Sequence, residues 1–443
     1  MDCPCNRSAS LTPWLGSHEG LCLFGSFLTV QNAPTTSDQS FSAFCFLAVT
    51  TVFRGARVVF MAKRKIAKKL AKKKSKRAGR PKAATRPPSL ASLRRRIDRL
   101  DKEIVQRINE RADLAHSIGK IKDAVGSVVY APGREEEVLT SAVEVSQGPL
   151  SEQCIRAIFR EIISGSRAIE KMMRVAFLGP LYSYSHLAAI HRFGQTVEFL
   201  PVGTIGSVFE EVHEGLADYG LVPVENSTDG RIADTLDNFI RYPVKISAEV
   251  QLRIHHNLLG HGSRGDVKEV YSRPQALSQC RRWLATHLPL ARTVEVTSTS
   301  TAAQVASDKP GAAAIASIQA GIQYGLDAIA TNIEDSEENL TRFAVISHES
   351  PPRSGKDKTA IMFQLEHRPG TLADAMSIFK RSKVNLSWIE SFPIPDSGGD
   401  YLFFIELQGH QQDIKVKRAI ASLGKKSLRL DILGSYAASA PIS

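Results

Sequence analysis

A proline-free stretch of regularly spaced apolar residues restricts what the first structured part of the chain can fold into. Apolar residues recur there three and four positions apart, which places them on one face of an α-helix. No proline occurs between Leu93 and Pro132, so one helix is predicted over residues 91–124. It exceeds the roughly 25 residues usual in globular proteins and is expected to pack against a long partner. The apolar positions are Leu93, Ile97, Leu100, Ile104, Ile108, Ala115 and Ile118.

Two shorter helical patterns follow the long one. They cover residues 133–146 and, after the helix-capping candidate Ser151, residues 152–172. The expected fold class of residues 91–172 is therefore an all-α, three-helix domain.

The charges on the long helix indicate an anion site. Arg111 and Lys122 are separated by about 16 Å along the axis and about 20° around it, so both can hold one small dianion. Arg94 lies about 25 Å from Arg111 along the same axis. If all three cations serve one site, Arg94 must come from a second protomer, and the long helix must pair in a dimer.

These helical segments resemble the all-helical chorismate mutases, on "LRRRIDRLDKEIVQRINERADLAHSIGKIK", "VYAPGREEEVL" and "EIISGSRAIE". The resemblance implies rearrangement of chorismate to prephenate without a cofactor, with Lys122 and Glu170 in catalytic roles. Glu135 is expected to accept a hydrogen bond from the substrate hydroxyl, and Ser166 and Glu170 to line the site. The carboxylate-binding residues implied are Arg94, Arg111, Lys122 and Arg134.

Two positions of this segment depart from the family pattern. Ala131 stands where an aspartate occurs in relatives, and Glu170 stands where many have a glutamine that donates a hydrogen bond to the substrate's ether oxygen. A carboxylate donates only when protonated, so either mutase activity rises toward acidic pH, or burial beside the substrate carboxylates raises the pKa of Glu170.

After Met173 the pattern changes to short apolar runs that alternate with helical ones, which predicts an α/β domain with a largely parallel sheet over residues 174–348. Polar clusters occur at the strand-to-helix junctions: "GPLYSYSH", "VENSTDG" and "TSTSTAA". Helix N-termini at the carboxyl ends of strands favour anions, so these clusters are candidates for one shared pocket. The strands expected are 175–179, 197–202, 219–225, 268–272, 293–298 and 312–317.

Together with "RPQALSQC" and "NLTRF", these clusters resemble prephenate dehydratase, a two-lobed domain like a periplasmic binding protein. The resemblance implies that Thr341 donates a proton to the leaving hydroxyl, while Arg342 and Phe343 shape the pocket. Tyr182 replaces a usual glycine, and Arg273 replaces a usual histidine, adding a candidate carboxylate contact. The other substrate-binding residues implied are Ser183, Asn226, Ser227, Thr228, Arg273, Gln275, Ser300 and Thr301.

Residues 349–358 read as a linker, and residues 359–436 follow the order β-α-β-β-α-β of an α+β ferredoxin-like unit. This unit resembles an ACT domain, which in this family binds phenylalanine at a dimer interface. Gly370, Thr371 and Leu372 of "RPGTL" and Glu390 and Ser391 of "ESFP" are the implied effector-binding residues. Phe392 stands where arginine is usual, so the identity of the effector stays open.

The N-terminal residues carry the chain's net charge of +12. Ala62–Arg86 holds 13 basic and no acidic residues, and the remaining 44 basic residues face 45 acidic ones. Residues 61–90 are expected to be a disordered basic tail, with attraction to nucleic acid as the alternative. Residues 1–60 are interpreted as a doubtful extension, with Met61 as the candidate start; their uncharged run, 41–53, is shorter than the ~20 residues of a membrane span.

The motifs together predict a bifunctional chorismate mutase and prephenate dehydratase, a homodimer or larger, regulated by phenylalanine. No metal or cofactor motif is present, and the cysteine spacing suggests neither a disulfide framework nor a metal site, which fits a cytoplasmic protein. Two alternatives remain: a non-enzymatic amino-acid-sensing or solute-binding module, and a dehydratase that uses arogenate.

Overall fold

The computed structural model describes residues 89–124, 130–228, 230–394 and 401–442. The expectations for residues 1–60 and for nearly all of the basic tail lie outside these ranges. So does the segment "PDSGGD", residues 395–400, for which the sequence predicts a turn between two strands. Within them, no helix combines the length and the apolar character needed to cross a membrane.

The N-terminal described unit consists of three helices, which confirms the sequence prediction to within two residues at each end. They are α2 (Leu90–Ala124), α3 (Pro132–Val145) and α4 (Glu152–Glu170). Pro132 opens α3, and the Ser151 hydroxyl caps α4 by accepting a hydrogen bond from the backbone N–H of Cys154 at 3.3 Å.

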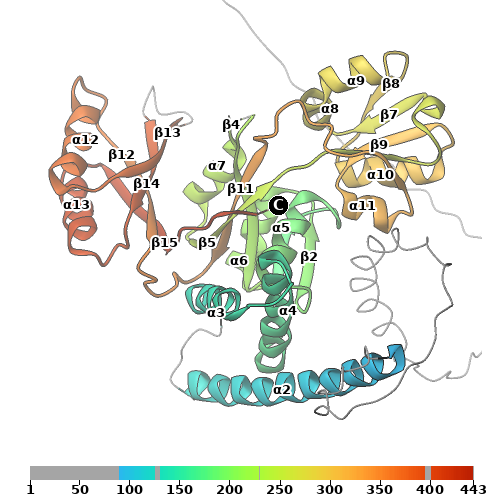
Figure 1. Ribbon diagram of the computed structural model, residues 1–443. Helices are drawn as coiled ribbons and strands as arrows, with labels where there is room; N and C mark the ends of the chain where they lie inside the picture. The colour runs from blue at the N-terminus through green and yellow to red at the C-terminus, as the bar shows by residue number, and fades with distance from the viewer. Residues whose placement is uncertain (1–88, 125–129, 229, 395–400, 443) are drawn as a thin grey trace, which may run out of the picture. The chain divides into compact units, whose positions relative to one another are not determined.

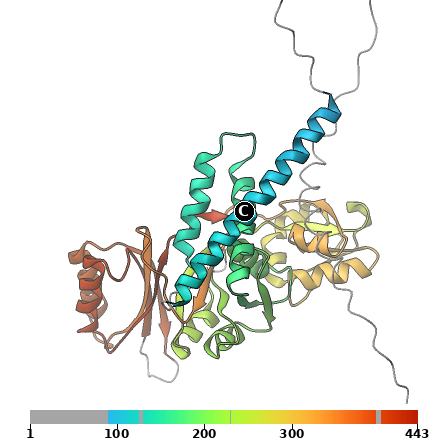
Figure 2. The same cartoon turned by 90° about the horizontal axis from the view of Figure 1, so that it is seen from below.

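The N-terminal half of α2 runs past α4 and projects from the rest of the unit (Figures 1 and 2). No described part of the chain covers its apolar face: Leu93, Ile97, Leu100 and Ile104 are 42% to 56% exposed. Such a row of large apolar side chains is typical of a helix that packs against another chain.

Residues 174–347, together with β16 near the C-terminus, form two lobes, each built around its own sheet (Figure 1). In the first lobe the order is β16-β5-β11-β3-β1-β2, with β4 beside β3. Helices α5 (Tyr184–Phe193), α6 (Ile205–His213) and α7 (Ala233–Arg241) belong to this lobe. The strands are β1 (Arg174–Leu178), β2 (Glu198–Val202), β3 (Tyr219–Asn226), β4 (Gly230–Arg231), β5 (Lys245–Arg253), β11 (Leu340–Ser347) and β16 (Pro441–Ile442).

The second lobe has the strand order β10-β6-β9-β7-β8. Its strands are β6 (Asn257–Gly260), β7 (Glu269–Ser272), β8 (Arg292–Glu295), β9 (Ala312–Ala316) and β10 (Asp327–Ala330). Its helices are α8 (Pro274–Gln279), α9 (Arg281–His287), α10 (Thr299–Asp308), α11 (Ile318–Gln323) and the short 3-10 helix η2 (Arg264–Asp266).

All six strands expected in this region are present, and those that pair with one another do so in parallel: β1 with β2 and β3, and β7 with β8 and β9. The expectation of a largely parallel sheet holds for these strands alone, because the remaining strands make both sheets mixed. β11 runs antiparallel to both β3 and β5, and β6 pairs antiparallel with β9 and β10. The sequence pattern did not predict β5 because buried Ser247 and Glu249, only 3% and 4% exposed, interrupt its apolar character.

The C-terminal unit has the predicted β-α-β-β-α-β order and an antiparallel sheet, β13-β14-β12-β15. Its first strand begins at Asp357, inside the segment expected to be a linker. Helices α12 (Thr371–Ser382) and α13 (Ile414–Gly424) cover the sheet face turned away from the first lobe (Figure 1). The strands are β12 (Asp357–Gln364), β13 (Leu386–Pro393), β14 (Tyr401–Gln408) and β15 (Arg429–Ala437).

The other face of this sheet shares a hydrophobic core with the first lobe. Met362 and Phe404 belong to the same buried cluster as Val222 and Ala344. At Gly434 the backbones nearly touch, since a Cβ there would lie 2.2 Å from the Ile246 carbonyl oxygen. After β15 the chain returns to the first lobe, where β16 pairs with β5.

Candidate functional site

Thr341 lies at the entrance of β11, opposite Asn226 at the end of β3. The Asn226 side-chain amide donates hydrogen bonds to Thr341 Oγ1 at 2.8 Å and to Asn339 Oδ1 at 3.2 Å. Thr341 is 8% exposed and Asn339 is 1% exposed. The structure therefore brings two of the sequence-predicted residues, the buried Thr341 and the half-buried Asn226, into direct contact.

Residues from both lobes complete this group. Thr228 donates to Asn226 Oδ1 from its backbone N–H at 3.0 Å and from its hydroxyl at 2.5 Å. From α8 of the second lobe, Gln279 donates to the Thr228 hydroxyl at 2.5 Å and accepts from the Asn339 amide at 2.9 Å. We call Asn226, Thr228, Gln279, Asn339 and Thr341 the Thr341 cluster; it joins the two lobes through hydrogen bonds.

The Thr341 cluster can donate hydrogen bonds to an anion or a leaving oxygen. Because Thr341 Oγ1 accepts from the Asn226 amide, its own hydrogen can point toward a ligand. Donors held in place at a site that excludes water stabilise developing negative charge more strongly than they would in water.

Several predicted carboxylate binders are engaged by the protein itself. The Ser227 hydroxyl donates to the Glu338 carbonyl at 2.6 Å, and the Ser300 hydroxyl donates to the Leu181 carbonyl at 2.7 Å across the lobes. Ser183 accepts a capping hydrogen bond at the start of α5. Thr301 Oγ1 lies 2.8 Å from Ser298 Oγ, the cap of α10. Their hydroxyls thus hold loops and helix ends at the junction between the lobes.

Arg273 and Gln275 are exposed at the start of α8, whereas Gln279 at its end belongs to the Thr341 cluster. Gln279 was not predicted as a site residue, although it lies in the quoted "RPQALSQC". Its position four residues after Gln275, on the same helix face, was the available signal.

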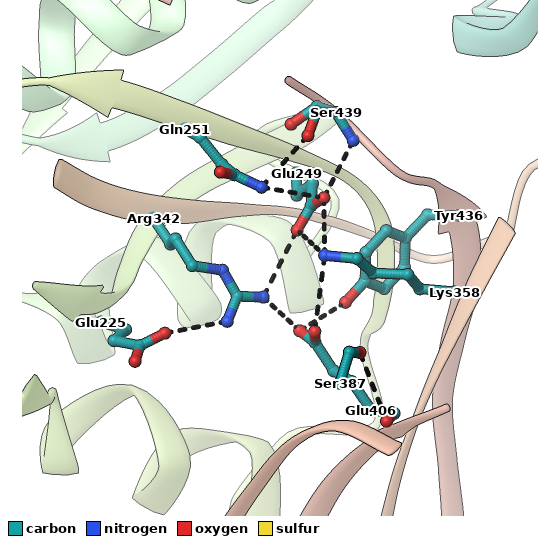
Figure 3. A network of polar contacts seen from close by, with 9 residues as sticks. All are labelled: Glu225, Glu249, Gln251, Arg342, Lys358, Ser387, Glu406, Tyr436 and Ser439. Carbon is teal, nitrogen blue, oxygen red and sulfur yellow. Dashed lines mark hydrogen bonds and ion pairs between the residues drawn. The ribbon is translucent and has the colours of Figure 1, made fainter. Parts of the chain in front are cut away.

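Arg342 does not share a pocket with Thr341, which corrects the sequence expectation. Neighbouring residues of a strand point to opposite faces. The Arg342 guanidinium contacts Glu225 at 2.8 Å, Glu249 at 3.3 Å and, on the C-terminal unit, Glu406 (Figure 3). Phe343 is 2% exposed and packs in the hydrophobic core of the first lobe.

A second polar group lies between α2, α3 and α4. Arg111 donates to the Ser166 hydroxyl at 2.9 Å, which joins two residues predicted for one site. The Glu170 side chain crosses Gly119 of α2, where a Cβ would lie 2.8 Å from Glu170 Oε2. Any larger residue at position 119 would therefore displace Glu170.

Glu135 is buried beside this group, and burial raises the pKa of its carboxyl above the ordinary value. Positive charges on Arg167, Arg192, Lys122 and Arg111 oppose that increase. Its direct ion-pair partner is Arg167, at 3.3 Å. Arg167 was not predicted as a site residue, although it lies in the quoted "EIISGSRAIE".

Two predicted cations lie outside this group. Arg134 is 72% exposed at its side chain and pairs with Glu137 at 2.8 Å, one helical turn away. Arg94 is exposed on the projecting half of α2. Neither is brought to Arg111 within this chain.

The predicted effector residues occupy two places on the C-terminal unit. Gly370 has φ 89°, a left-handed conformation that favours glycine, directly before Thr371 and the exposed Leu372. On β13, Glu390 pairs with Arg231 of β4 at 3.1 Å, and Arg231 also donates to the Ser391 carbonyl at 2.5 Å.

Phe392, at the position where the sequence departs from the family pattern, is 8% exposed. The Arg231 guanidinium carbon lies 5.7 Å from the centre of its ring. Within the ranges that the structure describes, no group of three or more His, Cys, Asp or Glu side chains is arranged to hold a metal ion.

Two family models match the chain: chorismate mutase type II over residues 93–171 and prephenate dehydratase over residues 175–351. A bifunctional chorismate mutase/prephenate dehydratase of Aquifex aeolicus is 41% identical over 78% of this chain and 97% of its own length. The corresponding protein of Stutzerimonas stutzeri is 40% identical over the same shares. Among solved structures, a prephenate dehydratase of Arthrobacter aurescens in complex with L-Phe is 32% identical, with a TM-score of 0.56, and the match covers 60% of this chain and 90% of that one.

Proposed function

The chain belongs to the family of bifunctional chorismate mutase/prephenate dehydratases, and on that premise we propose which of its residues perform each reaction. The Thr341 cluster serves the dehydration, and the group around Arg111, Ser166 and Glu170 serves the rearrangement. The observation that carries the first assignment is the hydrogen bond from Asn226 to Thr341 Oγ1. A non-enzymatic sensing module is not supported, because both catalytic domains match family models.

Rearrangement of chorismate is unimolecular and needs neither a nucleophile nor a base. Binding the dianion in a reactive conformation and stabilising its polarised ether oxygen suffice. Arg111 and Lys122 of α2 supply positive charge, and the Glu170 side chain of α4 lies directly against Gly119 of α2. Arg94 is too far along α2 to reach this site, so it serves the site of a second copy.

The exposed apolar face of α2 supports that arrangement. Pairing two copies along the projecting half of α2 would bury Leu93, Ile97, Leu100 and Ile104. The same pairing would place Arg94 of each copy near the other copy's Arg111 group. We therefore propose a homodimer as the smallest active mutase.

Dehydration of prephenate breaks two bonds. The ring carboxylate leaves as CO₂, its bonding electrons enter the ring, and the ring hydroxyl leaves as water once it receives a proton. Hydroxide is a poor leaving group, so a proton donor at that oxygen lowers the barrier. In our proposal Thr341 is that donor, Asn226 orients it, and solvent returns the proton after each turnover.

Phenylalanine is the proposed effector, bound to the C-terminal unit as an ACT-type domain. The L-Phe complex of the Arthrobacter aurescens relative supports this ligand. In this chain, Arg231 joins Glu390 and Ser391 of the effector motif to β4, which pairs with β3 beside Asn226. A movement of β13 on ligand binding would therefore be transmitted through Arg231 and β4 to Asn226 of the Thr341 cluster.

One assay on the purified protein tests the assignment. Chorismate should be consumed and phenylpyruvate should appear, and saturating phenylalanine should lower the second rate. Replacing prephenate with arogenate in the same assay tests the amino analogue as substrate. An Arg231→Ala protein should need more phenylalanine for half-inhibition, and unchanged sensitivity would contradict the proposed path.

A further inference from the structure

The Arg342 guanidinium is surrounded by carboxylates from two parts of the chain (Figure 3). Glu225 of β3 and Glu249 of β5 belong to the first lobe, whereas Glu406 of β14 belongs to the C-terminal unit. Lys358 of β12 also bridges the two parts, at 2.9 Å from Glu249 and 3.6 Å from Glu406. The strand that carries Thr341 is thus joined by ion pairs to a different unit of the protein.

This network is buried and strongly charged. The side chains of Glu249 and Glu406 are 3% and 5% exposed, and those of Arg342 and Lys358 are each 16% exposed. The Tyr436 hydroxyl donates to Glu406 Oε1 at 2.9 Å. Removing one partner of such a network leaves a buried charge without compensation, which destabilises the local arrangement strongly.

Arg342 stays charged in this position. Burial by itself lowers its pKa, but the neighbouring carboxylates of Glu406 and Glu249 outweigh burial and raise the pKa above the ordinary value. Its guanidinium also lies over the ring of Trp388 on β13, at 5.8 Å from the ring centre. The C-terminal unit therefore contacts Arg342 through two of its strands, β13 and β14.

Two successive residue pairs of the β3–β11 ladder connect the ion-pair network to the Thr341 cluster. Thr341 pairs with Asn226, and the next pair along the ladder is Arg342 with Glu225. On one face of the ladder Asn226 bonds to Thr341, and on the other Glu225 bonds to Arg342. The β3–β11 register shifts immediately after Arg342, and pairing resumes at Phe343 with Pro223, so a β-bulge separates these two pairs from the rest of the ladder.

We propose that Arg342 and Glu406 are positioning residues for the dehydration step. Glu406 of the C-terminal unit holds Arg342, and Arg342 holds the end of β11 that presents Thr341. The proposal rests on the function proposed for Thr341. Through Glu406 the C-terminal unit then contributes to the dehydratase site, with or without an effector.

The test replaces Glu406 with glutamine, which keeps the shape and removes the charge. Glu366→Gln is the matched control, because Glu366 lies on the same unit in an ion pair with the exposed Arg368. For each protein, the dehydratase kcat and KM, the mutase kcat and the Tm are measured on one preparation. Mutase activity reports the N-terminal helices, which carry neither Arg342 nor its ion-pair partners.

In Glu406→Gln the dehydratase kcat should fall about 10- to 100-fold, as expected when a catalytic group is misplaced by a distant change. The KM for prephenate should stay within about twofold, because Thr341 acts on the leaving group. Arg342→Lys should behave alike, and the double variant should be no worse than the poorer single variant, because both changes break one link. Mutase activity and the control protein should be unchanged.

An unchanged dehydratase kcat in Glu406→Gln would overturn the proposal, and so would additive losses in the double variant. If Glu406→Gln does not fold, Tyr436→Phe decides: it removes one donor to Glu406 and should lower kcat about two- to tenfold, and wild-type kcat would overturn the proposal. Thr341→Ala separates this inference from its premise. If that variant stays active, the proposed function fails; if it is inactive while Glu406→Gln is fully active, only the positioning role fails.

Discussion

The side-chain amide of Asn226 lies 2.8 Å from Oγ1 of Thr341, although 115 positions separate the two residues in the sequence. The pairing of β3 with β11 creates this contact. It leaves the threonine hydrogen available for a ligand, which is the arrangement that a proton donor requires.

Replacing Asn226 with aspartate tests that arrangement. The new carboxylate would accept the Thr341 hydrogen in place of donating to its oxygen, and would repel a carboxylate substrate. Dehydratase kcat/KM is expected to fall at least about 100-fold, the scale seen when one oriented donor is lost. Asn238→Asp is the control, since Asn238 is half-buried on α7 and its side-chain amide donates to the backbone carbonyl of Asp234. Equal losses in both variants would contradict the assignment.

Arg111 is expected to be required for the rearrangement alone. Lysine keeps the charge but cannot contact Ser166 and a substrate carboxylate with the same planar group. Mutase kcat/KM should fall about 10- to 100-fold in Arg111→Lys, while dehydratase activity on added prephenate persists. Arg107→Lys, one turn earlier on α2 with a 79% exposed side chain, should leave both rates unchanged.

Glu170 predicts the pH dependence of the mutase. A carboxyl group donates to the ether oxygen only when protonated, so the wild-type rate should rise as the pH falls. Glu170→Gln donates at every pH and should give a flatter profile, whereas Glu144→Gln on α3 should retain the wild-type slope. Identical profiles for Glu170→Gln and the wild type would remove Glu170 from the mechanism.

His186 predicts a loss of stability in acid. Burial lowers its pKa to about 4, from an ordinary value of 6.5. As the pH falls, the unfolded chain binds a proton at this histidine before the folded chain does. The contribution of neutral His186 to the free energy of unfolding is therefore fully present above about pH 6.5 and is lost as the pH drops toward about 4. Lowering the pH from 7 to 5 should decrease the free energy of unfolding by about 2 kcal/mol through this group.

Thermal unfolding at the two pH values measures this effect. His186→Asn keeps an acceptor for the Tyr182 N–H and removes the titrating group, so its Tm should drop less than that of the wild type. His261→Asn, at an exposed position, is the control. An equal drop in His186→Asn and the wild type would show that other groups cause the acid loss.

Local patterns predicted the elements well and the partners of single residues poorly. The apolar spacing of α2 and the β-α-β-β-α-β order of the C-terminal unit are local signals, and the described residues match them closely. Arg134 is predicted to bind substrate, and in the structure its exposed side chain pairs with Glu137, one turn away. Pairings such as Gln279 with Thr228 depend on the packing of two lobes, and no periodicity reports them.

In the motif containing Thr341 and Arg342, the sequence predicted that Thr341 and Asn226 belong to one site, and the two are in contact, but it wrongly placed Arg342 in the same pocket. Treating adjacent residues as one pocket ignored the alternation of side chains along a strand, although that alternation was available from the sequence. The sequence does not explain why the charged Glu249 occupies a buried position of β5. It becomes clear only with Arg342 and Lys358, which approach it from β11 and from the C-terminal unit.

The most direct test follows chorismate through both reactions with Thr341→Ala. Chorismate should disappear at the wild-type rate, prephenate should accumulate, and phenylpyruvate formation should fall at least about 100-fold, the lower range for loss of a general acid. Thr341→Ser, which keeps the hydroxyl, should restore most of that rate. Phenylpyruvate formed by Thr341→Ala at the wild-type rate would contradict the account, and so would equal loss of both activities.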